Sequence, residues 1–435
     1  MKRVEGLSRR AEILEKQKQF LFPSVITYYS EPLVVERAKD LCLYDTEGRE
    51  YLDFFGGILT VIAGHCNDRI TEAMVEQART LQHVSTLFPT IPQVELAEKL
   101  AAITPGRLQK SFFTNSGTEA NETAILMARA YTGRHEVVAL RHAYSGRSTL
   151  AMSLTANYAW RVGGSGLSGV AHAHNAYCYR CPFEKTYPDC NLICARDIEE
   201  MIRTATSGQL AAFIAEPIQG VGGFVTPPKE YFSIVAEIIR KYGGVFISDE
   251  VQTGFGRTGG KWFGIEHWGV QPDIITAAKG LANGAPIGAT IATPEIADSL
   301  KGLTISTFGG NPVSTRAAKA TIDFIESEKL VENARVVGDY LRDRLMELQE
   351  KHSSIGDVRG MGLMQGLELV RDRKTKEPAV EEAKQLMDLA RNNGLIIGKG
   401  GLYGNVLRIS PALTCARSDV DNAVGLLDRS FSQLH

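Results

Sequence analysis

Short apolar runs alternate with helical patterns between about residues 95 and 295, and this alternation constrains the fold more than any other feature. The runs typical of buried strands are SFFTN (111–115), EVVAL (136–140), LAAFIAEP (210–217), GVFISDE (244–250) and DIITAA (273–278). Apolar spacing between them predicts a helix from Gly117 to Tyr131 and another, YFSIVAEIIRKYG, that ends at Gly243. Strand–helix alternation predicts an α/β fold, a mostly parallel sheet sandwiched by helices. Functional groups of such a sheet gather at the carboxyl ends of its strands.

The pattern changes after Asn311-Pro312, where longer helical stretches begin. The chain has 435 residues, enough for two or three domains. We expect a large domain over 61–311 and a smaller α/β domain over 312–435. The segment 1–60 contains an apparent hairpin that turns at Thr46–Gly48, and we expect this segment to pack with the small domain.

Composition is that of an ordinary soluble enzyme, with a formal net charge of -2. This near-neutral charge gives no indication of nucleic acid or an anionic membrane as a partner. No window approaches the roughly 18 apolar residues of a membrane span. The N-terminus carries Glu5, Glu12 and Glu15 and has no apolar signal core, so a secretory or transit signal is not expected and the cytoplasm is the expected location.

Four of the seven cysteines cluster, with the spacing C-x2-C-x8-C-x3-C. They are Cys178, Cys181, Cys190 and Cys194. Spacing of this kind is compatible with zinc, but the x8 gap is short and the cluster contains no histidine. Reduced thiols that pack as small apolar side chains are the alternative, and we expect no metal in the main chemistry.

Two predicted strands end in residues that could take part in catalysis. Asp249 ends the run GVFISD, where it could be an acid in a site or simply a helix N-cap. Lys279 ends the run ITAAK and is followed by a glycine-rich stretch. Burial disfavours the charged form of a lysine, as a Schiff-base lysine requires, whereas an exposed lysine at a strand exit would do nothing special.

A third strand end has the sequence Asn115-Ser116-Gly117-Thr118 and opens a helix. Backbone N–H groups at a helix N-terminus bind anions, although the same residues also serve simply as caps. A phosphate cradle, an acid and a desolvated lysine on three strands of one sheet would together suit a phosphorylated pyridine aldehyde.

Seven ordered motifs carry a resemblance to a known family. They are NSGTEAN (115–121), HAYSGRS (142–148), AEPIQGVGG (215–223), SDEVQTGFGRTG (248–259), AAKGLANGAPIG (277–288), STFGGNP (306–312) and LRISPALT (407–414). From about residue 25 to 430 the chain resembles the class III pyridoxal-phosphate-dependent aminotransferases of fold type I. The resemblance is greatest to the alanine–glyoxylate and omega-aminotransferase branch. It implies pyridoxal 5'-phosphate as cofactor and a homodimer with active sites at the subunit interface.

The resemblance also implies roles for individual residues. Lys279 would hold the cofactor and then carry a proton, and Asp249 would keep the pyridine nitrogen protonated. The phosphate would be bound by the turn Ser116, Gly117 and Thr118, with Thr307 supplied by the other subunit.

The remaining implied contacts surround the cofactor ring and the substrate. Tyr144 and Val251 would lie on opposite ring faces, and Gln252 would bind the ring hydroxyl. Glu216, of the EPIQ motif, is counted among the cofactor-binding residues. Arg408 would bind a substrate carboxylate through two contacts; the alternative is a structural salt bridge.

One departure from relatives concerns the substrate. Ornithine and 4-aminobutyrate members have a glutamate five residues after Glu216 that can neutralise the carboxylate-binding arginine, and Val221 stands there in this chain. Arg408 should therefore stay available in both half-reactions. We expect ping-pong transfer from an alanine-like, β- or ω-amino donor to a small 2-oxo acid, pyruvate or glyoxylate.

Other hypotheses remain open. A phospholyase would use much the same residues, although Glu216–Gly220 has the aminotransferase form, and a dialkylglycine decarboxylase or an aminomutase ranks behind it. A non-catalytic binding protein on this fold is the alternative from another class. Such a protein should have lost at least one of the lysine, aspartate, phosphate turn and arginine.

Overall fold

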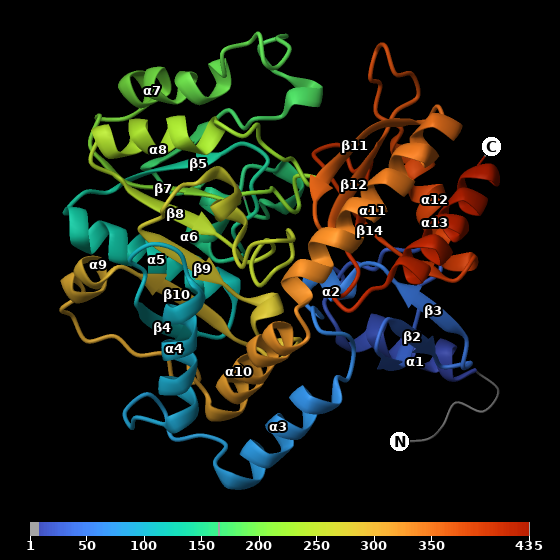
Figure 1. Ribbon diagram of the computed structural model, residues 1–435, viewed down its shortest axis with the longest axis horizontal. Coiled ribbons are helices and arrows are strands. Elements are labelled where there is room, and N and C mark those ends of the chain that lie inside the picture. The colour runs from blue at the N-terminus through green and yellow to red at the C-terminus, as the bar shows by residue number, and fades with distance from the viewer. Residues whose placement is uncertain (1–7, 164–165, 435) are drawn as a thin grey trace.

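The computed structural model describes residues 8–163 and 166–434 and is a mixed α/β structure built around one large sheet (Figure 1). The strand order in this sheet is β4-β10-β9-β8-β7-β5-β6. Its strands are β4 (Lys110–Thr114), β5 (Glu136–Leu140), β6 (Val170–Ala173), β7 (Leu210–Ala215), β8 (Val245–Asp249), β9 (Ile274–Ala277) and β10 (Gly288–Ala292). Neighbours from β6 to β9 pair in parallel, and only β10 runs antiparallel to the strands beside it. The predicted fold class is confirmed.

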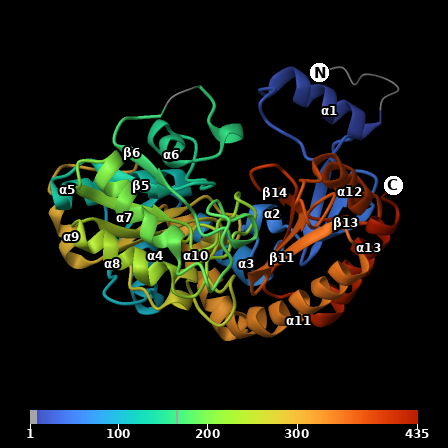
Figure 2. The same cartoon turned by 90° about the horizontal axis from the view of Figure 1, so that it is seen from above.

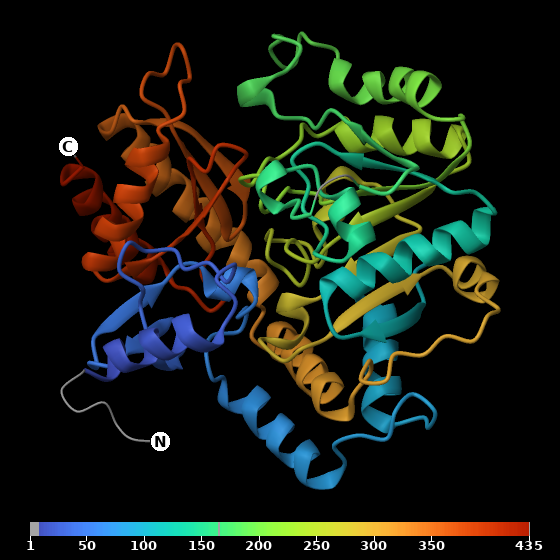
Figure 3. The same ribbon diagram turned by 180° about the vertical axis from the view of Figure 1, so that it is seen from behind.

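Helices cover both faces of this sheet because successive strand residues point to opposite sides. Val137, Ile214 and Ile247 pack with α5 (Gly117–Thr132) and α6 (Thr149–Leu154) on one face, which Figure 3 shows in front. Residues adjacent to these in the same strands, including Val138 and Phe246, pack with α7 (Ile193–Ala205) and α8 (Tyr231–Lys241) on the other face. Because helices cover both faces, side chains can meet a ligand only at the ends of the strands.

Two smaller sheets contain the remaining strands. One is antiparallel, in the order β11 (Ile355–Met361), β12 (Met364–Leu369), β15 (Val406–Ile409) and β14 (Gly398–Gly400). The other contains β1 (Val35–Lys39), β2 (Cys42–Asp45), β3 (Glu50–Asp53) and β13 (Leu395–Ile396), and β13 pairs in parallel with β3. Residues near the two ends of the chain therefore share one sheet, and Figure 2 shows them on the same side of the molecule. The domain boundaries at 60/61 and 311/312 stay a prediction.

The remaining helices surround these sheets. They are α1 (Arg9–Phe20), α2 (Gly56–Leu59), α3 (Asp68–Thr80), α4 (Ile91–Ile103), α9 (Pro294–Ser299), α10 (Pro312–Ser327), α11 (Leu330–Lys351), α12 (Val380–Asn392) and α13 (Arg417–Ser432). The short 3-10 helices are η1 (Tyr158–Trp160), η2 (Cys178–Arg180), η3 (Gly264–Trp268) and η4 (Lys279–Ala282). Asn311 caps α10, since its side-chain oxygen accepts from the N–H of Val313 at 2.9 Å. In the described ranges no helix combines the length and the apolar character that crossing a bilayer requires.

Candidate active site

A cavity of about 260 Å³ lies where the carboxyl ends of β4, β7, β8 and β9 meet. Its lining comprises Ser116, Gly117, Thr118, Asn121, Tyr144, Ser145, Gly146, Glu216, Asp249, Val251, Gln252 and Lys279. All the site residues expected from the sequence are in this lining except Thr307 and Arg408. A larger cavity, of about 940 Å³, lies beside β11 and contains none of the expected residues, so chemistry and not size identifies the site.

Asp249 ends β8 and is buried, with an orientation fixed by two donors. Its Oδ2 accepts a hydrogen bond of 2.8 Å from Asn121 Nδ2, and its Oδ1 accepts one of 3.1 Å from the N–H of Val251. Burial raises the pKa of Asp249, while Asn121, Val251 and Lys279 act in the opposite direction. An acid in these surroundings would gain from a cationic partner such as a protonated pyridine nitrogen.

Asn121 is a site residue for which the sequence predicted no role. The Thr276 hydroxyl donates to its Oδ1 at 2.7 Å, which fixes the amide so that Nδ2 faces Asp249 and the carbonyl of Ser145. A signal was present in the sequence, because Asn121 is a polar residue between Ala120 and Ala124 on the buried face of α5.

Lys279 opens η4 immediately after β9, with a φ of +48°. This left-handed backbone is unusual for a residue with a long side chain and turns the lysine out of the strand direction. Burial lowers its pKa to about 8, although the charges of Asp249 and Glu216 oppose the change and that of Arg408 assists it. A large fraction of this amine is therefore neutral and nucleophilic in mildly alkaline solution.

Glu216 follows β7 and links two neighbouring loops. Its carboxylate accepts from the N–H of Tyr144 at 3.1 Å and from the N–H of Gly220 at 2.8 Å. Burial, together with the charge of Asp249, raises the pKa of Glu216. The acid thus holds the loop that carries Tyr144 against the loop that begins at Gly220.

The turn that opens α5 forms one end of the cavity. Ser116 caps the helix by accepting from the N–H of Glu119 at 3.3 Å, and the first N–H groups of a helix have no partner within it. A Cβ at Gly117 would lie 3.0 Å from a methyl group of Val251, so glycine is what allows the two to approach. The turn therefore has the donors and the space for a phosphate.

Gln252 and Tyr144 border the same cavity. Gln252 Oε1 is buried and has no hydrogen-bond partner among the described residues. An orphan acceptor of this kind fits a ring hydroxyl as donor. The Tyr144 ring meets Trp160 edge to face, with centroids 5.4 Å apart. The cavity, the orphan acceptor, the phosphate turn and the lysine–aspartate pair together fit pyridoxal phosphate.

Arg408 lies on β15, just outside the cavity lining, and is only 3% exposed. Its two terminal nitrogens donate long hydrogen bonds, 3.4 Å each, to the carbonyl of Gly220 and the hydroxyl of Tyr28. The guanidinium carbon lies 4.9 Å from the centre of the Phe55 ring, and Nε has no partner among the described residues. None of the ion pairs formed by the described residues involves Arg408, so these residues provide no structural salt bridge for it.

Thr307 is exposed and lies apart from the cavity of its own chain. The four clustered cysteines do come together, since all of them line one small cavity of about 10 Å³. They are free thiols, and burial raises the pKa of Cys194 to about 12. Over residues 8–163 and 166–434, no group of three or more His, Cys, Asp or Glu side chains is arranged to hold a metal ion.

Comparison with known proteins agrees with this geometry. The family model "Aminotransferase class-III" matches residues 26–431. Alanine–glyoxylate aminotransferase 2 homolog 2, mitochondrial, from Arabidopsis thaliana is 46% identical over 97% of this chain and 87% of its own length. A leucine/methionine racemase from Thermococcus litoralis is 41% identical over 98% of this chain and 96% of its own length. The solved structure of a Bacillus anthracis aminotransferase has a TM-score of 0.92 and 32% identity, covering 98% of this chain and all of that one.

The similar plant protein is named as mitochondrial, and the human relative at 38% identity is too, which contradicts the expected cytoplasmic location. The composition of a soluble enzyme is the same in either compartment, so net charge and a few N-terminal acids could not decide the question. Glu5, one of those acids, lies outside the described residues. The family model and the extent of the similar proteins agree with the lysine, acid and phosphate turn at the strand ends, and the chain belongs to the class III aminotransferases, which use pyridoxal phosphate.

Proposed function

We propose that this enzyme transfers an amino group, by a ping-pong mechanism, from an alanine-like, β- or ω-amino donor to a small 2-oxo acid such as pyruvate or glyoxylate. The observation that carries the proposal is that the Lys279 amine and two buried acids line one cavity, beside an arginine that has no carboxylate partner among the described residues. The names of the similar aminotransferases support the same class of substrates.

Lys279 and Asp249 divide the proton chemistry between them. Bound pyridoxal phosphate supplies a ring that accepts the electrons released at the substrate α-carbon. Lys279 would hold the cofactor and, once the substrate amine replaces it, would move the proton at the α-carbon. Asp249, fixed by Asn121, would keep the proton on the ring nitrogen.

The other lining residues would position the cofactor. Ser116, Gly117 and Thr118 would bind its phosphate from one subunit and Thr307 from the partner. Tyr144 and Val251 would lie on opposite faces of the ring, and Gln252 Oε1 would accept from the ring hydroxyl. Glu216 would hold the Tyr144 loop in place through its backbone contact.

Arg408 would bind the carboxylate of donor and acceptor alike. The position from which a glutamate could neutralise it holds Val221, whose neighbour Gly220 already contacts the guanidinium through its carbonyl. A carboxylate would give the buried guanidinium the charge partner that it lacks.

We also propose a homodimer. An apolar surface surrounds the start of α4 and the segment before α10, with every member more than half exposed: Leu87, Phe88, Ile91, Val94, Leu303, Ile305 and Phe308. His83 and Phe308 have ring centres 5.2 Å apart, which joins the two segments into one surface. An apolar patch of this kind is typical of a subunit interface, and Thr307 lies within it.

A screen of half-reactions tests the proposal. Single amino compounds are added to the enzyme with its cofactor, and loss of the lysine-bound cofactor band and formation of oxo acid are measured. Alanine or a small β- or ω-amino compound should cause both. Release of phosphate from phosphoethanolamine without any acceptor would instead favour a phospholyase. Failure of every amine to change the band would indicate a binding protein.

A further inference from the structure

The loop Gly220-Val221-Gly222-Gly223 lies between the cavity and the small antiparallel sheet. The N–H of Gly223 donates to the carbonyl of Gly220 at 3.2 Å, which closes the loop as a tight turn. At its first residue the loop is tied to Glu216, whose carboxylate accepts from the N–H of Gly220. A shift of this loop would therefore also displace Glu216, which lines the cavity.

Two arginines contact the two ends of this loop from neighbouring positions in the sheet. Arg359 on β11 pairs with Gly366 on β12, which pairs in turn with Arg408 on β15. Because residues directly opposite in adjacent strands point to the same face, both arginines lie on the face that carries the loop. Arg359 Nε donates to the Gly223 carbonyl at 2.8 Å, and Arg408 donates to the Gly220 carbonyl at 3.4 Å.

The loop packs closely against the small antiparallel sheet. A Cβ at Gly366 would touch both the carbonyl oxygen of Gly223 and the Cβ of Phe224 at 3.4 Å. A Cβ at Gly223, where φ is +95°, would lie 2.9 Å from a methyl group of Val406. Phe224 itself packs under Arg408, with its ring centre 5.7 Å from the guanidinium carbon.

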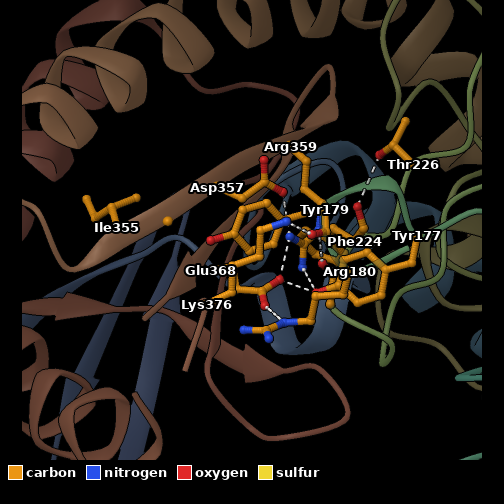
Figure 4. Close-up of polar contacts among 12 residues, drawn as sticks. Tyr177, Tyr179, Arg180, Phe224, Thr226, Ile355, Asp357, Arg359, Glu368 and Lys376 are labelled. Atoms are coloured by element: carbon orange, nitrogen blue, oxygen red, sulfur yellow. Dashed lines mark hydrogen bonds and ion pairs between the residues drawn. The ribbon is translucent and has the colours of Figure 1, made fainter. Parts of the chain in front are cut away.

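Arg359 is held rigidly on its other side, as Figure 4 shows. Its Nη1 donates to Glu368 and to Asp357, both at 2.7 Å, and its Nη2 donates to the Tyr177 hydroxyl at 3.2 Å. Glu368 is fully buried and also accepts from Tyr177 and Arg180. Burial alone would raise the pKa of Glu368, but Arg359, Tyr177 and Arg180 outweigh it and hold that pKa below its usual value.

We propose that Arg359 is a positioning residue for substrate binding: it fixes the Gly220–Phe224 segment and thereby orients Arg408 toward the substrate carboxylate. Arg359 does not bind the carboxylate itself, because each of its three nitrogens already donates to the protein. The inference rests on the proposed role of Arg408.

The test compares Arg359→Met and Arg359→Lys with the wild-type holoenzyme in steady-state assays with alanine and pyruvate or glyoxylate. Loss of a charge-assisted contact that acts only through Arg408 should raise KM for these substrates about tenfold, with kcat changed less than about twofold. Cofactor content should stay complete, and lysine should restore part of the affinity. Arg371→Met is the matched control, because Arg371 forms its ion pairs with Glu377 and Glu382 at the surface and should leave KM unchanged.

Tyr177→Phe serves as a second, milder variant should Arg359→Met fold poorly. It removes only the hydroxyl between Arg359 and Glu368, and it should raise KM by about threefold. Unchanged KM in the folded variants, or a fall in kcat and cofactor content without a rise in KM, would overturn the proposal. Arg408→Lys separates failure of the proposed carboxylate site from failure of the role of Arg359. If Arg408→Lys also leaves KM unchanged, the proposed carboxylate site is wrong. If Arg408→Lys raises KM and the Arg359 variants do not, only the role of Arg359 is wrong.

Discussion

Asn121 donates a hydrogen bond of 2.8 Å to Asp249, which joins the N-terminal part of α5 to the end of β8. The helix that presents the phosphate turn at Ser116 thus also orients the acid at the other end of the cavity. One rigid element therefore sets the distance between the two groups that would hold the cofactor's phosphate and ring nitrogen.

Replacement of Asp249 by asparagine should lower kcat/KM by at least about 100-fold, since the ring nitrogen would lose its anionic partner, worth about 3 kcal/mol. Asn121→Leu should lower kcat/KM by a smaller factor, because the Val251 N–H still donates to the Asp249 carboxylate. Steady-state kinetics with cofactor content as the control measures both effects. Equal losses in the two variants would show that orientation and not charge is the contribution of Asp249.

Attachment of the cofactor to apoenzyme should follow the titration of Lys279. Its pKa is lowered to about 8, so the neutral amine predominates above that pH and the protonated amine below it. The rate of attachment, which borohydride reduction would trap, should rise as pH increases through about 8 and then level off. Stopped-flow absorbance measures the rate. Lys279→Ala should show no attachment, whereas the exposed control Lys261→Ala should behave as wild type.

Val221→Glu should introduce the negative charge that can neutralise the carboxylate-binding arginine in ornithine and 4-aminobutyrate members of the family. A carboxylate beside Arg408 would compete with the substrate carboxylate, so KM for alanine and for the oxo acid should rise about tenfold. Val221→Gln has nearly the same shape without the charge and should change KM far less. Similar effects of the two variants would mean that volume, and not charge, matters at position 221.

Ile91→Glu should weaken the proposed dimer, because it places a charge within the exposed apolar surface. Sedimentation should show a monomer with reduced activity, since Thr307 could no longer reach the partner's site. Met346→Glu, on the exposed side of α11, is the control and should stay dimeric. A wild-type chain that sediments as an active monomer would refute the interface.

Local patterns were sufficient to predict much of this molecule. The strands β5 and β8 are continuous buried runs, and Asp249 and Lys279 stand out because each ends such a run. The strand β10 escaped prediction because GATIA is made largely of small residues, and a Cβ at Gly288 would lie 2.3 Å from the Ser116 carbonyl. Gly288 therefore leaves space for the turn at Ser116, and a glycine makes the run less typical of a strand.

Long-range register explains what the sequence could not reveal. Arg359 lies near Arg408 only because the hairpin β11–β12 pairs with the later strand β15, which places Gly366 between the two arginines. Asn121 likewise gains its role from the approach of α5 to β8 and β9. A local pattern can show a polar residue on a buried helix face, as at Asn121, but it cannot show which partner that residue meets.

A single-turnover experiment with L-alanine alone tests the central claim most directly. The enzyme with its cofactor is mixed with alanine in the absence of any oxo acid, and pyruvate and the pyridoxamine form of the cofactor are both quantified. Transfer through Lys279 predicts one pyruvate for each active site, together with an equal amount of pyridoxamine phosphate. Formation of D-alanine without pyruvate, the outcome expected of a racemase, would contradict the account.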